Sequence, residues 1–569
     1  MPEILSANSV TPAAVPSRTN HHRVTRTAAA VASGGLLVSM GAVGATPAFA
    51  ADATDCAPGN TVDAATGTAG DIQTLLDANT AIVCLSGTFP LTAPLEFDHN
   101  LTLFGLTAGE LDGNDSTRLI EGGAGARLTV QNLSLVDGSA VRGGAIFVDG
   151  DLTVENSSFA NNTADEDGGA IYVAIATGNP TILVTDSTFS GNATGPLIDG
   201  FDGYSGGAIY SDSIGTFTIT GSEFTGNSAS YLGGAVFGYA VLTEQSTLSN
   251  NSAGGGGALY AALMASLEST YSDNSAEYGG GVMALAYAAS IGSTFVGNEA
   301  SFAGGAIASG LGGGGGLGGY GSVQSLNSTF VDNTAVEFGG AILADYGQVS
   351  LSTFLNNQVD SSGEGNAIYL FADESEIEIA GNVFAGTSSA AQLGAEPLGA
   401  YSDLGGNVFS TARATEAALV APHPSTLFSR SVTSLFGPSP ALTANGGTTA
   451  TVALVSGSPA IDAVPPETLD QIDFLPTSAL ASAAAELQSV ADLTAAAADA
   501  GLDQRNIERT GFADAGAFEF GDAELAATGS DATTNGWLAA LGAMLLGSGV
   551  AAALVARRRS RTASKSYAP

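Results

Sequence analysis

The sequence is poor in positive charge. Its 569 residues include 15 Lys and Arg against 55 Asp and Glu, a formal net charge of −40. Such a chain is repelled by a phosphate backbone, which argues against nucleic acid as a partner. Only two Cys occur, which excludes a disulfide-dense miniprotein and a metal site built from clustered Cys. We therefore expect neither a metal nor a cofactor.

Bulky and charged residues are also scarce. Charged residues make up 12% of the chain and there is one Trp, whereas Gly occupies 77 positions. Hydrophobic residues still reach 44%, too many for a disordered chain. Length alone would allow three or four domains, but the bias toward small residues favours thin, stacked elements over a bulky globular core.

The first 50 residues have the pattern of a secretory signal. Scattered basic residues precede an apolar stretch at 28–43, and an A-x-A motif ends the segment. We expect cleavage between Ala50 and Ala51, directed by Ala48 and Ala50. The alternative, a transmembrane helix, would need a longer apolar stretch without Ser33 and two glycines.

The C-terminus carries a second targeting signal. The pentapeptide Leu525-Ala526-Ala527-Thr528-Gly529 is followed by a polar spacer, an apolar segment at 537–556 and an Arg cluster. That segment is long enough to span a bilayer, and the basic cluster after it would be held inside. The order of these parts resembles the cell-wall sorting signals of Gram-positive surface proteins, with an L-A-x-T-G motif as read by class E sortases.

That resemblance implies a sortase and peptidoglycan as partners. The enzyme would cut between Thr528 and Gly529 and transfer the Thr528 carboxyl group to an amine of the wall. The alternative is a permanent membrane anchor. Without both targeting signals, residues 51–528 hold 53 acidic and seven basic residues, a formal net charge of −46.

Two short motifs alternate between residues 143 and 368. One is Gly-Gly-Ala followed by an aliphatic residue, first at 143–146, with degenerate copies at 280–283 and 365–368. The other is an aromatic residue or Leu with Asn three positions later. Its eight Asn are spaced 30, 35, 24, 23, 24, 35 and 24 residues apart, and they are Asn162, Asn192, Asn227, Asn251, Asn274, Asn298, Asn333 and Asn357.

A unit of about 24 residues that contains short β-branched segments and no helical periodicity predicts coils of strands. We predict a right-handed parallel β-helix, an all-β solenoid of the pectate-lyase-like type. Gly pairs would form corners, aromatic rings would stack between coils, and the Asn side chains would form an inward amide ladder.

The alternating G-G-A-[ILV] and F-x-x-N motifs resemble those of the polymorphic membrane protein adhesins, whose passenger domains are β-helices. The resemblance covers residues 140 to 385. That family ends in an outer-membrane β-barrel, whereas this chain ends in the sorting signal, so the mode of display does not carry over.

The region before the repeats reads as a cap. Residues 71–77 predict a short amphipathic helix, which would cover the open end of the solenoid. Cys56 and Cys84 both lie in this region of an exported chain, so we predict a disulfide between them.

After the repeats, four landmarks occur in order, and they resemble the choice-of-anchor Q region of secreted β-helix proteins. They are residues 441–447, 457–462, 503–505 and 514–519. We expect Asp503, Arg505 and Glu519 to be salt-bridged cap residues in the last coils. The Ala-rich stretch at 477–500 reads as a helical insertion.

Catalysis is not favoured. Residues 143–412 contain no Lys, Arg or His, so this region has no conventional cationic base and no cation for a uronate, which argues against a lyase. An inverting glycosidase needs only two carboxylates about 6.5 to 9.5 Å apart, and acids two coils apart, at about 4.8 Å per coil, would lie near that distance. The candidates are Asp165, Glu166 and Asp167, then Asp199 with Asp202, then Glu374 with Glu376; the alternative is that they are solvated turn residues.

The sequence thus predicts a cell-wall-anchored, adhesin-like surface protein that binds a host surface or a glycan without catalysis. The runner-up is an extracellular carbohydrate-active hydrolase, and a passive spacer is a third possibility. The predicted parts are a signal peptide (1–50), a cap with the first coils (51–140), repeat coils (141–410), C-terminal coils and cap (411–520), the sorting motif with its spacer (521–536), a transmembrane helix (537–556) and a basic tail (557–569).

Overall fold

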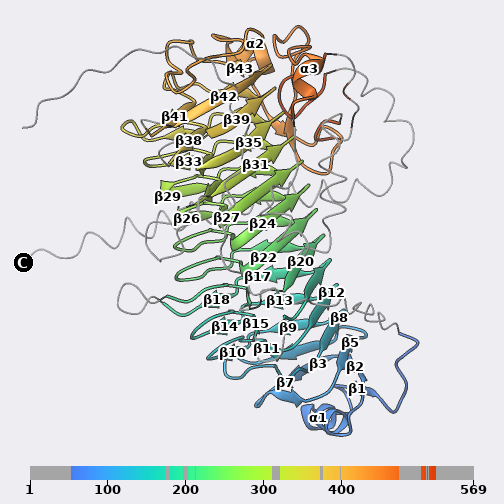
Figure 1. Cartoon of the computed structure of the whole chain (residues 1–569). Coiled ribbons are helices and arrows are strands. Elements are labelled where there is room, and N and C mark those ends of the chain that lie inside the picture. The colour runs from blue at the N-terminus through green and yellow to red at the C-terminus, as the bar shows by residue number, and fades with distance from the viewer. Residues whose placement is uncertain are drawn as a thin grey trace, which may run out of the picture. The chain divides into compact units, whose positions relative to one another are not determined.

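The fold is a right-handed parallel β-helix, as predicted. The structure, a computed structural model, describes residues 53–520 except 175–178, 197–202, 212, 214, 311–320, 372–375, 397–398, 473–501, 506, 508 and 510–511. The predicted signal cleavage site, sorting motif, transmembrane segment and Ala-rich insertion lie outside these residues. Figure 1 shows strands of successive coils lying side by side, from α1 at one end to β43 at the other.

Each coil contributes strands to three parallel columns. The first column consists of β4 (Leu95–Phe97), β7 (Ile120–Ala124), β11 (Ile146–Asp149), β15 (Ile171–Val173), β19 (Ile209–Ser211), β30 (Ile307–Ser309), β34 (Ile342–Ala344), β38 (Ile368–Leu370) and β41 (Leu393–Ala395). Three long strands, β22 (Val236–Glu244), β24 (Leu259–Leu267) and β27 (Val282–Ile291), run through the first and second columns.

The second column consists of β1 (Thr61–Asp63), β2 (Ile82–Ser86), β5 (Leu101–Gly105), β8 (Leu128–Gln131), β12 (Leu152–Glu155), β16 (Ile182–Thr185), β20 (Thr216–Thr220), β31 (Ser322–Leu326), β35 (Tyr346–Ser350), β39 (Glu376–Ala380) and β42 (Ala400–Gly405). The third consists of β3 (Thr88–Pro90), β6 (Glu110–Asp112), β9 (Ser134–Val136), β13 (Ser158–Ala160), β17 (Thr188–Ser190), β21 (Glu223–Thr225), β23 (Thr247–Ser249), β25 (Thr270–Ser272), β28 (Thr294–Val296), β32 (Thr329–Val331), β36 (Thr353–Leu355), β40 (Val383–Ala385) and β43 (Val408–Phe409).

Shorter strands pair at one corner of the coils. They are β10 (Ser139–Ala140), β14 (Thr163–Ala164) and β18 (Ala193–Thr194) in one sheet, and β26 (Ser275–Tyr278), β29 (Glu299–Ala303), β33 (Thr334–Ala335) and β37 (Gln358–Val359) in another.

The interior contains a stack of aromatic rings. Phe159, Phe189 and Phe224 lie 4.7 and 4.5 Å apart between ring centroids, and each is fully buried. Leu248 takes the next place in register, and the stack resumes at Tyr271 and continues through Phe409. Each stacked pair contributes about 0.5–1.5 kcal/mol beyond burial of its area, so the repeat adds stability coil by coil.

The eight Asn of the repeats form the ladder that their spacing predicted. The Asn192 Oδ1 atom accepts hydrogen bonds from both the backbone N–H and the side-chain amide of Asn162, at 3.0 Å each. The Asn192 amide in turn donates to the Phe159 carbonyl and to Asn227 Oδ1. All eight side chains are buried. They satisfy backbone groups that the turn would otherwise leave unpaired.

A second ladder, which the sequence reading missed, occupies the corner before the third column. Ser187 N–H donates to Ser222 Oγ at 3.1 Å, Ser222 N–H to Ser246 Oγ, and Ser246 N–H to Ser269 Oγ. The residue before each of these Ser has a positive φ, as at Asp186 and Gly221. This conformation favours Gly, Asn and Asp, although Gln245, Glu268 and Leu351 also adopt it at this corner.

The second Gly of each Gly-Gly pair is required by the close approach of the coils. A Cβ atom on Gly207 would lie 2.0 Å from the Gly234 carbonyl oxygen of the next coil. One degenerate copy is shifted by one residue from the predicted alignment. Leu259 pairs with Val282, so residues 279–282 form the corner and Gly281 takes the place of Ala. Three consecutive glycines made this register ambiguous in the sequence.

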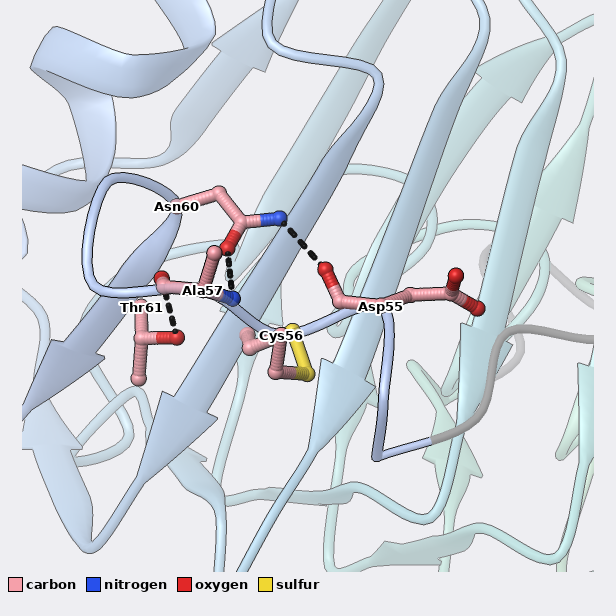
Figure 2. Close-up of a disulfide and its surroundings, with 6 residues drawn as sticks. Asp55, Cys56, Ala57, Asn60 and Thr61 are labelled. Carbon is pink, nitrogen blue, oxygen red and sulfur yellow. Dashed lines mark hydrogen bonds between the residues drawn. A yellow bond between two sulfur atoms is a disulfide. The ribbon is translucent and has the colours of Figure 1, made fainter.

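The N-terminal cap contains the predicted helix and disulfide. Helix α1 (Ala69–Asp77) buries Ile72 and Leu76 against the first coils, and the Asp71 carboxylate accepts hydrogen bonds from Thr68 N–H and Oγ1. These bonds lower the pKa of Asp71. The Cys56–Cys84 disulfide ties the segment before β1 to β2 (Figure 2), and its prediction is confirmed. Closing a loop of this size contributes about 3 kcal/mol.

The region after β43 divides into two parts. Residues 411–430 close the stack: Phe428 stacks on Phe409 at 5.2 Å, and the Glu416 carboxylate accepts hydrogen bonds from the N–H groups of Gln392 and Leu393 at the edge of β41. Burial raises the pKa of Glu416. These residues form the end of the solenoid that the sequence reading expected over 411–520.

The described residues of 431–520 instead lie along the outside of earlier coils, and we call them the flank segment. It contains α2 (Val432–Phe436), α3 (Pro466–Leu469) and an antiparallel pair, β44 (Leu442–Thr443) and β45 (Thr451–Val452). Its apolar residues, among them Val452, Leu454 and Val464, share a buried cluster with outward-facing residues of the coils such as Val331 and Leu355.

Polar residues fasten the flank segment to the coils. The Gln504 side chain donates to the Gly292 carbonyl and to Thr449 Oγ1, and it accepts from Thr329 Oγ1 at 2.7 Å. Gly516 N–H donates to the Gly381 carbonyl at 2.7 Å. These bonds and the apolar contacts are made with the outward side of coils between Gly292 and Gly381, so the flank segment stabilises the side of the stack.

Asp503, Arg505 and Glu519 lie in the flank segment rather than in the last coils. Arg505 pairs with Asp503 at 2.6 Å, and its guanidinium lies 3.7 Å from the centroid of the Phe518 ring. Glu519 pairs with Arg509 at 3.0 Å, a partner that the sequence reading did not identify. The Arg509 guanidinium also donates to Asn327 Oδ1, so this ion-pair cluster joins the flank segment to the coils.

Candidate functional site

An aromatic ladder stands on the outside of the first column. It comprises Phe147, Tyr172, Tyr210, Phe237 and Tyr260, one residue from each of five consecutive coils, and we call it the outer ladder. Its ring centroids are 5.5, 5.1, 4.7 and 5.1 Å apart, and the rings are within 12° of parallel. Four of the five side chains are partly exposed, whereas Tyr172 is buried.

The position of these rings follows from the repeat itself. Each ring belongs to the residue directly after the Gly-Gly-Ala-aliphatic motif, as at Tyr210 after 206–209. The aliphatic residue faces the core, and because side chains alternate along a strand, the next one faces outward. The same outward column continues through Met283, Ala308, Leu343 and Tyr369.

The later part of this column is covered. Ala308, Leu343 and Tyr369 are buried in a cluster with Tyr278, Phe302 and Phe338, which come from the neighbouring corner. Over the earlier coils the rings retain partial exposure. The open part of the column therefore comprises four rings of the outer ladder, all but Tyr172, together with Met283.

Two Arg lie at the start of the ladder. The Arg118 guanidinium is 5.1 Å from the Phe147 ring centroid, and the Arg142 guanidinium is 5.3 Å from the Tyr172 ring centroid. Each also pairs with a carboxylate, Arg118 with Glu121 and Arg142 with Glu166 at 2.6 Å. Neither cation is available as a free positive charge.

Two exposed Tyr residues lie near the other end of the ladder, and one of them, Tyr239, is on β22 together with Phe237. Tyr231 is 45% exposed and Tyr239 is 41% exposed, the largest exposures among the described aromatic residues of these coils. Tyr231 lies close enough to Tyr260 to affect its ionisation, and burial together with this neighbour raises the pKa of Tyr260 to about 12. Tyr210, Phe237 and Tyr260 with Tyr231 and Tyr239 form one Tyr-rich surface, which we call the tyrosine patch.

The electrostatic setting of the patch is strongly negative. Residues 143–412 carry 27 Asp and Glu and no Lys, Arg or His. In the described part of the mature region, five Arg form ion pairs with carboxylates: Arg118, Arg127, Arg142, Arg505 and Arg509. The repeat coils therefore carry a large net negative charge, which attracts cationic partners and repels anionic ones.

Of the acids proposed from the sequence, Asp165 and Glu376 are exposed, as expected of solvated turn residues, whereas Glu166 and Asp167 have structural partners. The Glu166 carboxylate pairs with Arg142, and Asp167 Oδ1 accepts a hydrogen bond from Ser205 N–H at 2.9 Å. Asp199, Asp202 and Glu374 lie outside the described residues. Among the described residues, no group of three or more His, Cys, Asp or Glu side chains is arranged to hold a metal ion.

A different pair of carboxylates lines a groove near the end of the solenoid. Glu364 and Glu396 both face this groove, together with Thr415 and Val420. The Tyr369 hydroxyl donates to Glu396 Oε1 at 3.3 Å, and burial with the two nearby carboxylates raises the pKa of Tyr369. The sequence reading missed this pair because the two acids are 32 residues apart and meet only when adjacent coils stack.

The outer ladder was missed for a related reason. Its signal is present, because an aromatic residue follows the first five copies of the Gly-Gly-Ala motif. The coil lengths differ through insertions, so the rings do not recur at a constant interval. Aligning the copies on their Gly pairs, rather than on chain distance, would have identified the column.

Three segments of the chain match the family model described as the Chlamydia polymorphic membrane protein repeat: residues 156–174, 186–212 and 245–262. Each contains one ladder Asn, one Gly-Gly-Ala motif and one ring of the outer ladder, namely Tyr172, Tyr210 or Tyr260. The chain is thus a parallel β-solenoid that carries repeats of this type. No curated protein and no solved structure matches it.

The described residues include no helix of the length and apolar character that a membrane crossing requires.

Proposed function

We propose that the chain is exported to the cell surface, where its solenoid acts as an adhesin-like binding protein without catalysis. The observation that carries this proposal is the outer ladder: a row of partly exposed rings built by repeats that match those of Chlamydia polymorphic membrane proteins. Rigid aromatic rows on a surface supply contact area at low entropic cost, which suits recognition.

The test of adhesion compares cells that display the full chain with cells that lack it. We expect the displaying cells to bind a host-cell monolayer more strongly, and a substitution of Tyr231 and Tyr239 to Ser to reduce that binding. Equal binding by cells with and without the chain would refute adhesion and leave a passive spacer as the function.

We further propose that the mature chain is joined covalently to peptidoglycan through Thr528 by a class E-like sortase. The support is the order of pentapeptide, apolar segment and Arg cluster at residues 525–561. Digestion of purified walls with a muramidase should release the chain with a wall peptide on Thr528, as read by mass spectrometry. Substitution of Thr528 by Ala should abolish that linkage, and recovery of the variant in the wall digest would contradict the proposal.

The alternative function is a glycoside hydrolase. The groove at Glu364 and Glu396 supports hydrolysis better than the acids proposed from the sequence do, because two carboxylates line the same groove. Reducing-sugar release from a panel of polysaccharides, lost in Glu364→Gln and in Glu396→Gln, would establish hydrolysis. Binding to the same panel without release would support the binding function.

A further inference from the structure

We propose that the tyrosine patch binds a cationic protein surface, rich in Arg and Lys, rather than a glycan or a second copy of this chain. This inference rests on the proposed adhesion and names the class of partner. It is argued from the stacking of the rings, from the charge of the coils and from the exposure of Tyr231 and Tyr239.

The stacking argues against a glycan on the rings of the outer ladder. An aromatic residue that holds a sugar offers an open ring face. In the outer ladder, neighbouring rings cover each other's faces at centroid distances of 4.7 to 5.5 Å, and Arg118 lies over Phe147 at the first end. At the other end Met283 follows Tyr260 in register. Only the edges of these rings remain open to contact. They form a ridge, which can pack against a complementary protein surface.

The charge argues against self-association. A second copy would bring 27 further carboxylates, with no cation from residues 143–412, toward the same surface. Like charges placed across an interface oppose binding, whereas a basic surface is attracted and steered by the same field. A cationic partner is therefore the one that the electrostatics of the coils favours.

The exposed rings provide the contacts for such a partner. Tyr231 and Tyr239 lie beside the ladder at 45% and 41% exposure, and neither stacks on another described ring. Arg and Lys bind over open aromatic faces, with Arg the more frequent partner. The patch thus combines a rigid ridge with two rings at its margin that can each accept a cation, within a field that raises the local concentration of basic segments.

The experiment measures binding of a nona-arginine peptide to the immobilised full chain. We expect saturable binding that weakens as sodium chloride rises from about 50 to 300 mM, because the attraction is screened. The double variant Tyr231→Ser/Tyr239→Ser should lose about tenfold in affinity. A nona-glutamate peptide should not bind, and the thermal midpoint of the variant should equal that of the parent.

The matched control is Leu183→Ser/Phe371→Ser, which removes two apolar side chains of similar exposure, 41% and 37%, away from the patch. It should bind nona-arginine as the parent does. Equal affinity of both double variants would overturn the proposal, because binding would then depend on net charge alone. Binding of a neutral glycan panel that is lost in the tyrosine variant would overturn it in favour of a glycan.

The failure of this inference is distinguishable from the failure of adhesion. If cells displaying the chain adhere and the tyrosine variant adheres equally, the patch is not the binding surface while adhesion stands. If displaying cells adhere no better than cells lacking the chain, adhesion fails whatever the peptide shows.

Discussion

The third column of the solenoid has two stretches with the same interior and different exteriors. In the earlier coils, β13 to β25, the outward residues are Ser, Thr, Glu and Ala, and they lie at the surface. In the later coils, β28 to β40, several outward positions hold Val, Leu or Ala, and most are buried beneath the flank segment. The inward aromatic residue is retained in both.

This difference shows that the inward residues of the repeat are retained whether or not the outward residues change. The interior ladders determine that a coil forms, whereas the outward residues determine what lies on it. The flank segment has no sequence feature that shows where it docks. The docking surface on the coils differs from the rest of the third column because Val and Leu replace Ser and Thr at outward positions. Predictions that alter either exterior, or the shared interior, therefore test this separation.

The largest expected effect comes from breaking the ion-pair cluster of the flank segment. The Arg509 side chain is fully buried and donates to Asn327 Oδ1, to the Gly516 carbonyl and to Glu519. Arg509→Met leaves these acceptors unpaired, so we expect the free energy of unfolding to fall by about 3–5 kcal/mol. Urea unfolding measures the change.

The control for this substitution lies in the early coils. Arg127 pairs with Asp151 at 3.0 Å but is 53% exposed. Arg127→Met should cost less than about 1 kcal/mol, as is usual for exposed pairs. A comparable loss in both variants would contradict the view that the buried cluster fastens the later coils.

Removal of a ladder Asn should affect both stretches equally. Asn227 lies in the early coils and Asn333 in the later ones, and their hydrogen bonds match. In each case Nδ2 donates to the backbone carbonyl of a Phe residue, at 3.0 and 2.9 Å. We expect Asn227→Ala and Asn333→Ala each to cost about 2–3 kcal/mol, because buried partners lose their acceptors. A loss confined to one of them, measured by the same unfolding experiment, would show that interior and exterior are coupled.

A smaller effect is expected from exchanging the exteriors. Val331→Ser gives a later coil the outward residue of an early one and removes a buried side chain, which should cost about 1–2 kcal/mol. Ser249→Val makes the reverse change at a partly exposed site and should stay within about 0.5 kcal/mol. If both changes were neutral, docking of the flank segment would not depend on these side chains.

The smallest effect is a pH dependence of the flank segment. Its cluster joins three carboxylates, Asp503, Asp514 and Glu519, to Arg505 and Arg509, so one negative charge is in excess. Burial, which outweighs the attraction of Arg509, raises the pKa of Glu519 from 4.5 to about 7. The folded state therefore binds this proton more tightly than the unfolded state does.

The sign follows from that difference. Stability from this group is fully present below about pH 4.5 and is lost as the pH rises through about 7, so the thermal midpoint should be lower at pH 8 than at pH 5. Repulsion among the other carboxylates is also weaker at the lower pH, which likewise makes the protein more stable at pH 5 than at pH 8. Glu519→Gln is therefore the control. The parent should lose more stability than this variant between the two pH values; an equal loss in both would contradict the assignment.

The interior of the solenoid was predictable because each of its positions has a single physical task. A buried corner that must satisfy its own backbone groups accepts Asn, and a ring that must stack on the next coil accepts Phe, so residues such as Asn162 and Phe159 recur visibly. The Ser corner was less visible, because Ser is common elsewhere in the chain. The corner at 279–282 was displaced by one residue because three glycines offered two registers.

The surfaces were not predictable in the same way. Glu364 and Glu396, or Tyr231 and Tyr260, are distant in the chain, and they come together only because insertions of different length leave the coils in register. Nothing in the sequence around Arg509 indicates that its guanidinium is buried, where it donates to the Gly516 carbonyl and to Asn327.

The amino-acid sequence by itself determined that this protein is a β-helix, where its coils turn, and which cysteines join. The coils and their turns depend on contacts between identical positions of neighbouring repeats, which the repeat spacing already encodes, and the disulfide follows because the chain has only two Cys. The tertiary structure alone decided which rings form the open outer ladder and where the flank segment docks. Those outcomes depend on which surfaces face each other after the coils have stacked, and no local pattern records that.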